Sequence, residues 1–152
     1  MIALGCDHAG YKLMQEVKKY LDEHNLEYKD YGTDSEQSCD FPVYGAAVGH
    51  AVANGECDRG IVICGSGIGI SMAANKIPGA RAGLCCNAYA AEMTRRHNDA
   101  NILAMGERFV GVGLALKIVE VFLNTGFDGD LPGGERHARR IEEFSEIEKG
   151  NL

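Results

Sequence analysis

Short apolar runs alternate with amphipathic segments along most of this chain. The first apolar run, residues 1–6, precedes residues 11–24, in which Leu13, Val17 and Leu21 recur at helical spacing. Such spacing predicts a helix with one buried face, and a short apolar run predicts a buried strand. The pattern predicts strands at 1–6, 26–31, 61–64, 81–86 and 102–105, and helices at 11–24, 42–53, from 70 onward, from 87 to about 97, and at 112–124.

Repeated strand–helix units predict an α/β fold, with a parallel sheet of five strands and helices on both faces. Ligands of such sheets bind at the carboxyl ends of the strands, near the point where the strand order reverses. Asp7 and His8 follow the first predicted strand, and residues 64–69 follow the third. We therefore expect a functional site at this edge of the sheet.

The C-terminal part of the chain differs in composition from the rest. Residues 126–135 are rich in Gly, Asp and Pro, which is typical of a linker. Residues 136–149 predict a short charged helix that has too few apolar residues to stand alone, so we expect it to dock on the body or on a second subunit. A length of 152 residues suits one domain, 1–152, in which residues 126–152 form the linker and a helical tail.

The composition excludes several classes of partner. A net charge of −7 disfavours binding to nucleic acid or to an anionic membrane. The chain has no apolar run of 18 residues and no signal-peptide pattern, which favours a cytoplasmic protein that contacts no membrane. Its six cysteines include no C-x-x-C pair, so we expect no metal site, and a cytoplasmic location disfavours disulfides.

Three alternate glycines, Gly65, Gly67 and Gly69, follow the third predicted strand. Position 70 is Ile rather than Gly, and no Lys follows at P-loop spacing, so neither nucleotide-binding motif is complete. Backbone N–H groups of a glycine-rich loop before a helix can nevertheless hold an anion. The alternative is a tight strand-to-helix turn with no ligand.

Cys64 lies directly before this loop. A helix N-terminus favours the thiolate form of a cysteine, so Cys64 is a candidate base or nucleophile. The alternative is a buried cysteine that only packs in the core. Ser66 can hydrogen-bond a substrate oxygen or cap the helix that follows.

Further candidates are Asp7 and His8, which can form a site or simply begin a helix, and His97, which ends a predicted helix. We expect His97 on the same side of the sheet as Cys64.

Arg136 and Arg140 are four residues apart and share a helix face, and such a guanidinium pair suits a phosphate dianion. A solvated tail is the alternative. Arg108, after the fifth strand, is another cationic candidate.

Together these segments resemble ribose-5-phosphate isomerase type B and its relatives that act on allose 6-phosphate and galactose 6-phosphate. The resemblance spans nearly the whole chain. It rests on GCDHAG at 5–10, DFPVYG at 40–45, ICGSGIGISMAANK at 63–76, RRHNDANILAMG at 95–106, and the basic segment 136–140.

The resemblance implies a Rossmann-like three-layer α/β/α sandwich that forms a homodimer, or a tetramer, with active sites at the subunit interface. It implies isomerisation of a small phosphorylated sugar without metal or cofactor. Cys64 would be the base, His97 would open the sugar ring, and Ser66 would assist at the substrate oxygens. The implied substrate-binding residues are Asp7, Tyr44 and Asn98 for hydroxyls, His8, Arg108, Arg136 and Arg140 for the phosphate, and Gly65, Ser66, Gly67, Ile68 and Gly69 for the enediolate.

Three functions stay open at this point. The first is an isomerase of ribose 5-phosphate and ribulose 5-phosphate, and the second is the same reaction on a six-carbon sugar phosphate. The third is a non-catalytic sugar-phosphate-binding subunit, which the presence of both Cys64 and His97 disfavours. One branch of the family has a Glu base where this chain has Ile70, which favours the Cys branch, and many relatives have Thr where this chain has Ser66.

Overall fold

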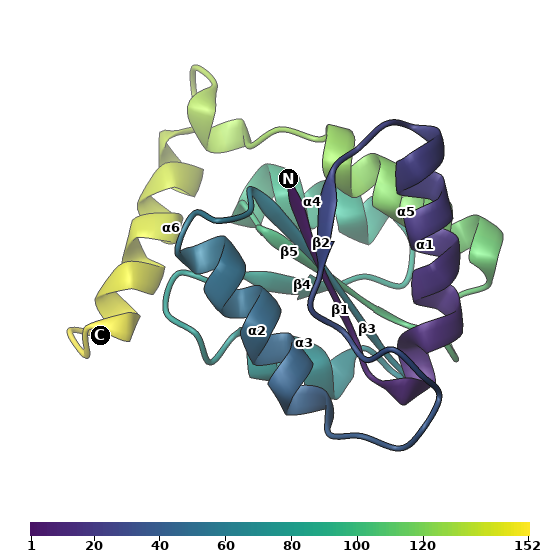
Figure 1. Ribbon diagram of the computed structural model, residues 1–152. Helices are drawn as coiled ribbons and strands as arrows, with labels where there is room; N and C mark the ends of the chain where they lie inside the picture. The colour runs from purple at the N-terminus through teal and green to yellow at the C-terminus, as the bar shows by residue number, and fades with distance from the viewer.

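A parallel sheet of five strands forms the centre of the molecule (Figure 1). The structure is a computed structural model that describes residues 1–152. The strands lie side by side in the order β2-β1-β3-β5-β4, which confirms the predicted α/β fold. Their bounds are β1 (Ile2–Cys6), β2 (Tyr28–Asp30), β3 (Arg59–Cys64), β4 (Ala82–Leu84) and β5 (Ile102–Gly106).

Helices connect the strands and cover both faces of the sheet (Figure 1). Their bounds are α1 (Tyr11–Glu23), α2 (Phe41–Ala53), α3 (Ile68–Ala74), α4 (Ala88–Asn98), α5 (Val112–Asn124) and α6 (Glu135–Glu148), with 3-10 turns η1 (His8–Gly10) and η2 (Asp128–Asp130). The edge strands β2 and β4 are shorter than predicted, because each pairs with only one neighbour, over three residues. The predicted linker contains η2.

Alternate residues of the inner strands β1, β3 and β5 belong to the two halves of the core. Leu4 packs in a cluster with residues of α1, α4 and α5, whereas Ala3 packs in a second cluster with residues of α2 and α3. This alternation follows from the pleat of a strand, in which successive side chains point to opposite faces. Cys64 belongs to the α2–α3 side.

Two glycines allow α2 to approach the sheet closely. A Cβ atom on Gly5 or on Gly60 would lie 2.6 Å from a methyl group of Val48, which a packed core cannot accommodate. Close packing of α2 on β1 and β3 places the first turn of the helix, which carries Phe41 and Tyr44, beside the carboxyl ends of both strands. The fold thereby fixes one wall of the candidate site.

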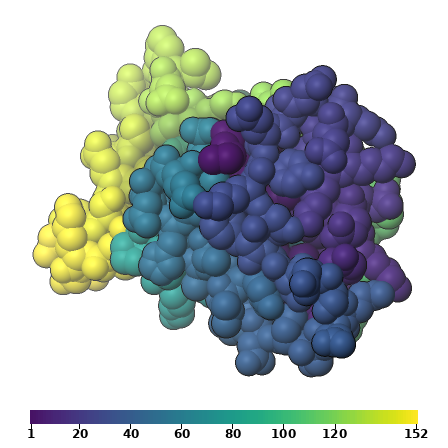
Figure 2. Space-filling view, in the orientation of Figure 1, coloured from purple at the N-terminus to yellow at the C-terminus, as the bar shows by residue number.

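The C-terminal helix α6 packs on α4 and η2 rather than on the centre of the sheet. Its end is held by Glu148, whose carboxylate accepts a hydrogen bond of 2.7 Å from the backbone N–H of Gly79. The helix projects from the side of the molecule opposite α1 (Figures 1 and 2). None of the helices has the length and apolar character needed to span a membrane.

Arg95 anchors the end of α4, although it is fully buried. Its guanidinium donates to the Asp99 carboxylate at 2.7 Å and to the backbone carbonyls of Ala100 and Thr125 at 2.6 and 3.1 Å. A buried cation is stable only when it is paired and hydrogen-bonded in this way. The network fixes the last turn of α4, which carries His97.

Candidate active site

A cavity of about 260 Å³ opens at the carboxyl ends of β1 and β3. These two strands are neighbours at the point where the strand order reverses, which is where α/β sheets bind their ligands. The cavity brings together the segments that the sequence singled out after the first and third strands. The lining residues are Asp7, His8, Ala9, Phe41, Cys64, Gly65, Ser66, Gly69 and Arg108.

Asp7 is both a helix cap and a lining residue of the cavity. Its Oδ1 accepts hydrogen bonds of 3.0 and 3.1 Å from the backbone N–H groups of Ala9 and Gly10 at the start of η1. The side chain is nearly fully buried, so this capping fixes its position. Because both capping bonds go to Oδ1, Oδ2 has no hydrogen-bond partner within the chain and can accept a bond from a ligand hydroxyl.

The His8 imidazole is held by the loop between β2 and α2. Its Nδ1 lies 3.2 Å from the backbone nitrogen of Cys39, which can only donate. Nδ1 is therefore the acceptor, and in the neutral imidazole Nε2 carries the proton. Nε2 is thus free to donate a hydrogen bond to a ligand.

The glycine loop after β3 wraps around the Cys64 thiol. Gly67 has a φ of +76°, and a Cβ there would lie 2.6 Å from a Leu84 methyl and 2.7 Å from the Met105 backbone. Only glycine meets both conditions. This conformation directs the Gly67 N–H at Cys64 Sγ, over 3.1 Å. A donor aimed at sulfur stabilises negative charge on it.

Two N–H groups of the loop are already used within the chain. The Gly67 N–H bonds Cys64 Sγ, and the Ile68 N–H bonds Ser66 Oγ at 3.2 Å. The amides of Gly65, Ser66 and Gly69 form no backbone hydrogen bond and are the donors open to a ligand. Because Ser66 Oγ accepts from Ile68, its hydroxyl proton also remains free to donate.

Arg108 and Phe41 lie close against the same loop. A Cβ on Gly65 would lie 3.1 Å from Arg108 Nη1, and one on Gly69 would lie 2.7 Å from the Phe41 ring. The glycines therefore admit a cation and an aromatic ring to the backbone of the loop. Together they give the cavity a thiol, amide donors, one guanidinium and an apolar wall.

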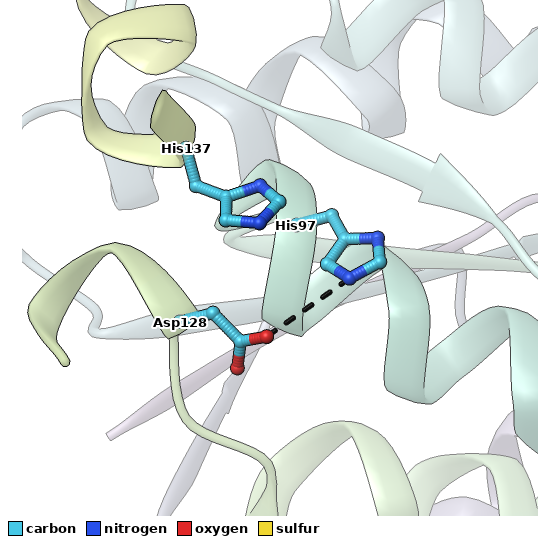
Figure 3. A group of neighbouring side chains, drawn as sticks. All are labelled: His97, Asp128 and His137. Atoms are coloured by element: carbon cyan, nitrogen blue, oxygen red, sulfur yellow. Dashed lines mark ion pairs between the residues drawn. The ribbon is translucent and has the colours of Figure 1, made fainter. Parts of the chain in front are cut away.

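The structure overturns the prediction that His97 lies on the same side of the sheet as Cys64. His97 lies near Asp128 and His137, which come from η2 and α6 (Figure 3). The physical reason is that α4 runs back from the end of β4 to the start of β5, antiparallel to the strands. Its last turn therefore lies at the amino ends of the strands, whereas Cys64 lies at the carboxyl end.

The register of the sheet shows how far apart the two groups are. Gly60 pairs with Ile102, at the amino end, and Cys64 pairs with Gly106, four residues along. Four residues of a strand span about 13 Å, and His97 lies beyond Ile102. Within one chain, His97 therefore cannot reach a ligand bound at Cys64.

Three other predicted site residues lie on the His97 side. Asn98 lines a second cavity, of about 420 Å³, between α4, β4 and α6, whose wall includes Arg81 and Phe144. Arg136 and Arg140 are exposed on α6, and neither forms an ion pair. We call the group His97, Asn98, Arg136 and Arg140 the α4–α6 cluster.

Of the other predicted residues, Tyr44 is on the first turn of α2, beside the cavity but outside its lining, and the Ile68 side chain is 42% exposed. Sequence reasoning missed Phe41, Cys39 and Asp128 as site residues. Phe41 precedes the helix-starting Pro42, which is a local signal. Nothing in the sequence indicates that the Cys39 amide meets His8 or that Asp128, within a presumed linker, meets His97.

The fold and the cavity define an α/β protein with a glycine loop, whose N–H groups are partly free, beside a thiol at the switch point of a parallel sheet. The Ribose/Galactose Isomerase family model matches residues 2–144, so the chain belongs to this family. It is 46% identical over 148 residues to ribose-5-phosphate isomerase B of Escherichia coli. The matched residues cover 97% of this chain and 96% of that protein.

Two other relatives show the range of the family. The galactose-6-phosphate isomerase subunit LacB of Clostridium acetobutylicum is 34% identical over 152 residues, which cover 100% of this chain and 87% of that protein. Among solved structures, Clostridium thermocellum ribose-5-phosphate isomerase B superposes with a TM-score of 0.93 at 52% identity, and the match covers 99% of both chains. The chain is thus similar over its full length to isomerases of phosphorylated sugars.

Proposed function

We propose that this protein interconverts ribose 5-phosphate and ribulose 5-phosphate. The observation that carries the proposal is the Cys64 thiol, which lies in a switch-point cavity beside three free backbone N–H groups and Arg108. Isomerisation of an aldose to a ketose needs a positioned base, donors for the enediolate and a grip on the phosphate. The similarity to ribose-5-phosphate isomerases B supports the choice of substrate.

In the proposed reaction Cys64, as the thiolate, takes the proton from C2 of the open-chain aldose. The C2–H electrons form the C1–C2 double bond, and the carbonyl oxygen at C1 receives the negative charge. The free amides of Gly65, Ser66 and Gly69 stabilise this enediolate, and the Ser66 hydroxyl serves the transfer of the proton between the two oxygens. The thiol then returns its proton at C1. This acid–base chemistry requires neither metal nor cofactor.

The α4–α6 cluster supports a homodimer in which each site draws on both subunits. Within one chain, Cys64 is out of reach of His97, Arg136 and Arg140. In a dimer with a two-fold axis, the cluster of each copy would lie at the cavity of the other, which gives two equivalent sites. Large apolar side chains of α3, the helix that follows the glycine loop, are exposed, among them Ile68 and Met72, the latter 61% exposed. We assign His97 to ring opening and Asp7, Tyr44 and Asn98 to the sugar hydroxyls.

The phosphate would be held by His8 and Arg108 in the cavity and by Arg136 and Arg140 across the interface. Free thiols at all six cysteines fit a reducing compartment, so we place the reaction in the cytoplasm.

The direct test is a coupled assay with purified protein on ribose 5-phosphate, allose 6-phosphate and galactose 6-phosphate. The highest kcat/KM is expected for ribose 5-phosphate. A preference for either six-carbon substrate would move the protein to the second function, for which the LacB relative is the precedent. No turnover of any of the three, with inorganic phosphate still bound, would indicate a non-catalytic binding subunit.

Mixing two inactive variants tests whether the site is shared. We expect co-expressed Cys64→Ala and His97→Asn subunits to regain about a quarter of the wild-type activity, because half of the dimers are hybrids and each hybrid restores one complete site. Each variant alone is the control. If the mixture stays as inactive as the separate variants, despite hybrid dimers on native mass spectrometry, Cys64 and His97 do not cooperate across an interface.

The phosphate role of α6 predicts a binding defect. Arg136→Ala and Arg140→Ala should each raise KM and the inhibition constant of inorganic phosphate about tenfold or more, because each loses a charge-assisted contact worth roughly 1.5–3 kcal/mol. Arg139→Ala, also exposed on α6, is the matched control and should change little. Unaltered KM and phosphate inhibition in the first two variants would contradict the assignment.

A further inference from the structure

Asp128 brings a carboxylate to His97 from a segment that no motif singled out. Its Oδ2 lies 3.9 Å from His97 Nε2, which is within ion-pair distance (Figure 3). The Asp128 side chain is only 21% exposed, against 43% for His97. A partly shielded carboxylate at this distance favours the ring orientation that presents an imidazole N–H to it.

Arg96 fixes the position of this carboxylate. Its Nε donates to both Asp128 oxygens, at 3.1 and 3.2 Å, and its Nη2 lies 3.1 Å from Oδ2. These hydrogen bonds hold the pKa of Asp128 below its usual value, and the positive charges of Arg96, His97 and His137 lower it further. Asp128 therefore remains a carboxylate at neutral pH.

His137 forms the third side of the group. Its ring stacks on that of His97, with centroids 4.7 Å apart and planes 8° from parallel. The His137 side chain is buried, and its Nδ1 has no hydrogen-bond partner. Burial lowers the pKa of His137, and the charges of Arg136, His97 and Arg140 lower it further, while Asp128 opposes them. The His137 ring is thus neutral at neutral pH.

The surrounding charge decides what these three side chains can do. One ligand atom from each lies within 4.8 Å of the others, a spacing at which a divalent metal could be considered. However, the carboxylate is already paired with Arg96, and Arg136 and Arg140 add positive charge next to His137. A divalent cation is therefore disfavoured here, and what remains is the contact of the Asp128 carboxylate with the His97 ring.

We propose that Asp128 is a positioning residue for His97: it holds the imidazole in place against the ring of His137, where it can donate a proton to the sugar ring oxygen. This inference rests on the proposed function, because ring opening is the step that needs an acid at His97. In that step the proton moves from the His97 imidazolium to the ring oxygen as its bond to C1 breaks. The hydroxyl proton at C1 is lost to solvent as the aldehyde forms.

The test is Asp128→Asn, which keeps the shape of the side chain and removes its charge. Its kcat/KM on ribose 5-phosphate should fall about tenfold, through kcat rather than KM, because the acid is no longer held in position. Solvent deuterium exchange into ribulose 5-phosphate, which needs no ring opening, should be preserved. Asp130→Asn, in the same turn but exposed, is the matched control, and Asp128→Glu should restore part of the activity.

A second measurement does not depend on turnover. The His97 ring resonances, identified by their loss in His97→Asn, should shift in Asp128→Asn relative to the wild type and to Asp130→Asn, because the ring is no longer held in the same place against His137. Unchanged resonances together with an unchanged kcat/KM would overturn the role of Asp128. If the wild type does not isomerise ribose 5-phosphate but the resonances shift as expected, the proposed function fails while the His97–Asp128 coupling stands.

Discussion

Cys64→Ala is expected to abolish isomerisation while leaving the fold nearly intact. Loss of a positioned base lowers kcat by about 100- to 10,000-fold or more. Alanine keeps the Cβ atom and removes only the sulfur that accepts from the Gly67 N–H. The measurement is kcat on ribose 5-phosphate, with thermal unfolding and inorganic phosphate binding as checks that the variant is folded and its phosphate site intact.

The matched control is another buried cysteine. Burial raises the pKa of Cys85 to about 12, and that of Cys6 likewise to about 12, so both are thiols at neutral pH and cannot act as thiolate bases. Cys85→Ala should therefore keep nearly full kcat, with at most a modest loss of stability from the small cavity. If Cys64→Ala retained more than about half of the wild-type kcat, the thiol would be a packing residue and another base would have to be found.

The sheet and its helices were predictable because their signals are local. Buried strands such as β3 and β5 are continuous apolar runs, and α5 has the predicted bounds, 112–124, because its apolar face repeats at helical spacing. Strand order has no local signal, because it depends on pairing between strands that are far apart in the sequence. The sequence has no signal for β5 lying between β3 and β4.

The two halves of the candidate site differ in the same way. Asp7, Cys64 and the glycine loop were placed together because each directly follows a strand, and the carboxyl ends of parallel strands meet at one edge. His97 was misplaced because a helix that returns to the next parallel strand ends at the opposite edge. That geometric rule follows from connectivity alone and was available from the sequence. The meeting of Asp128 with His97 was not, since it depends on how η2 and α6 dock on α4.

The second large effect is expected for His97→Asn, which keeps a polar side chain of similar reach and removes the titrating group. Turnover of ribose 5-phosphate, which is mostly cyclic, should fall by about 100-fold or more, because a general acid is lost. Proton exchange on ribulose 5-phosphate should change far less. That sugar cannot close a furanose ring, since its C5 oxygen carries the phosphate, so the exchange needs Cys64 but no ring opening.

The measurement is the incorporation of solvent deuterium into ribulose 5-phosphate, compared with steady-state turnover of ribose 5-phosphate by the same preparation. Cys64→Ala is the control, because loss of the base should stop both reactions. Equal loss of exchange and turnover in His97→Asn would place His97 in the proton-transfer step itself. Unequal loss would instead separate the two steps. Because His97 lies at the amino ends of the strands in its own chain, the two steps would then use groups from different subunits. Ring opening would then belong to the α4–α6 cluster and proton transfer to the cavity at Cys64.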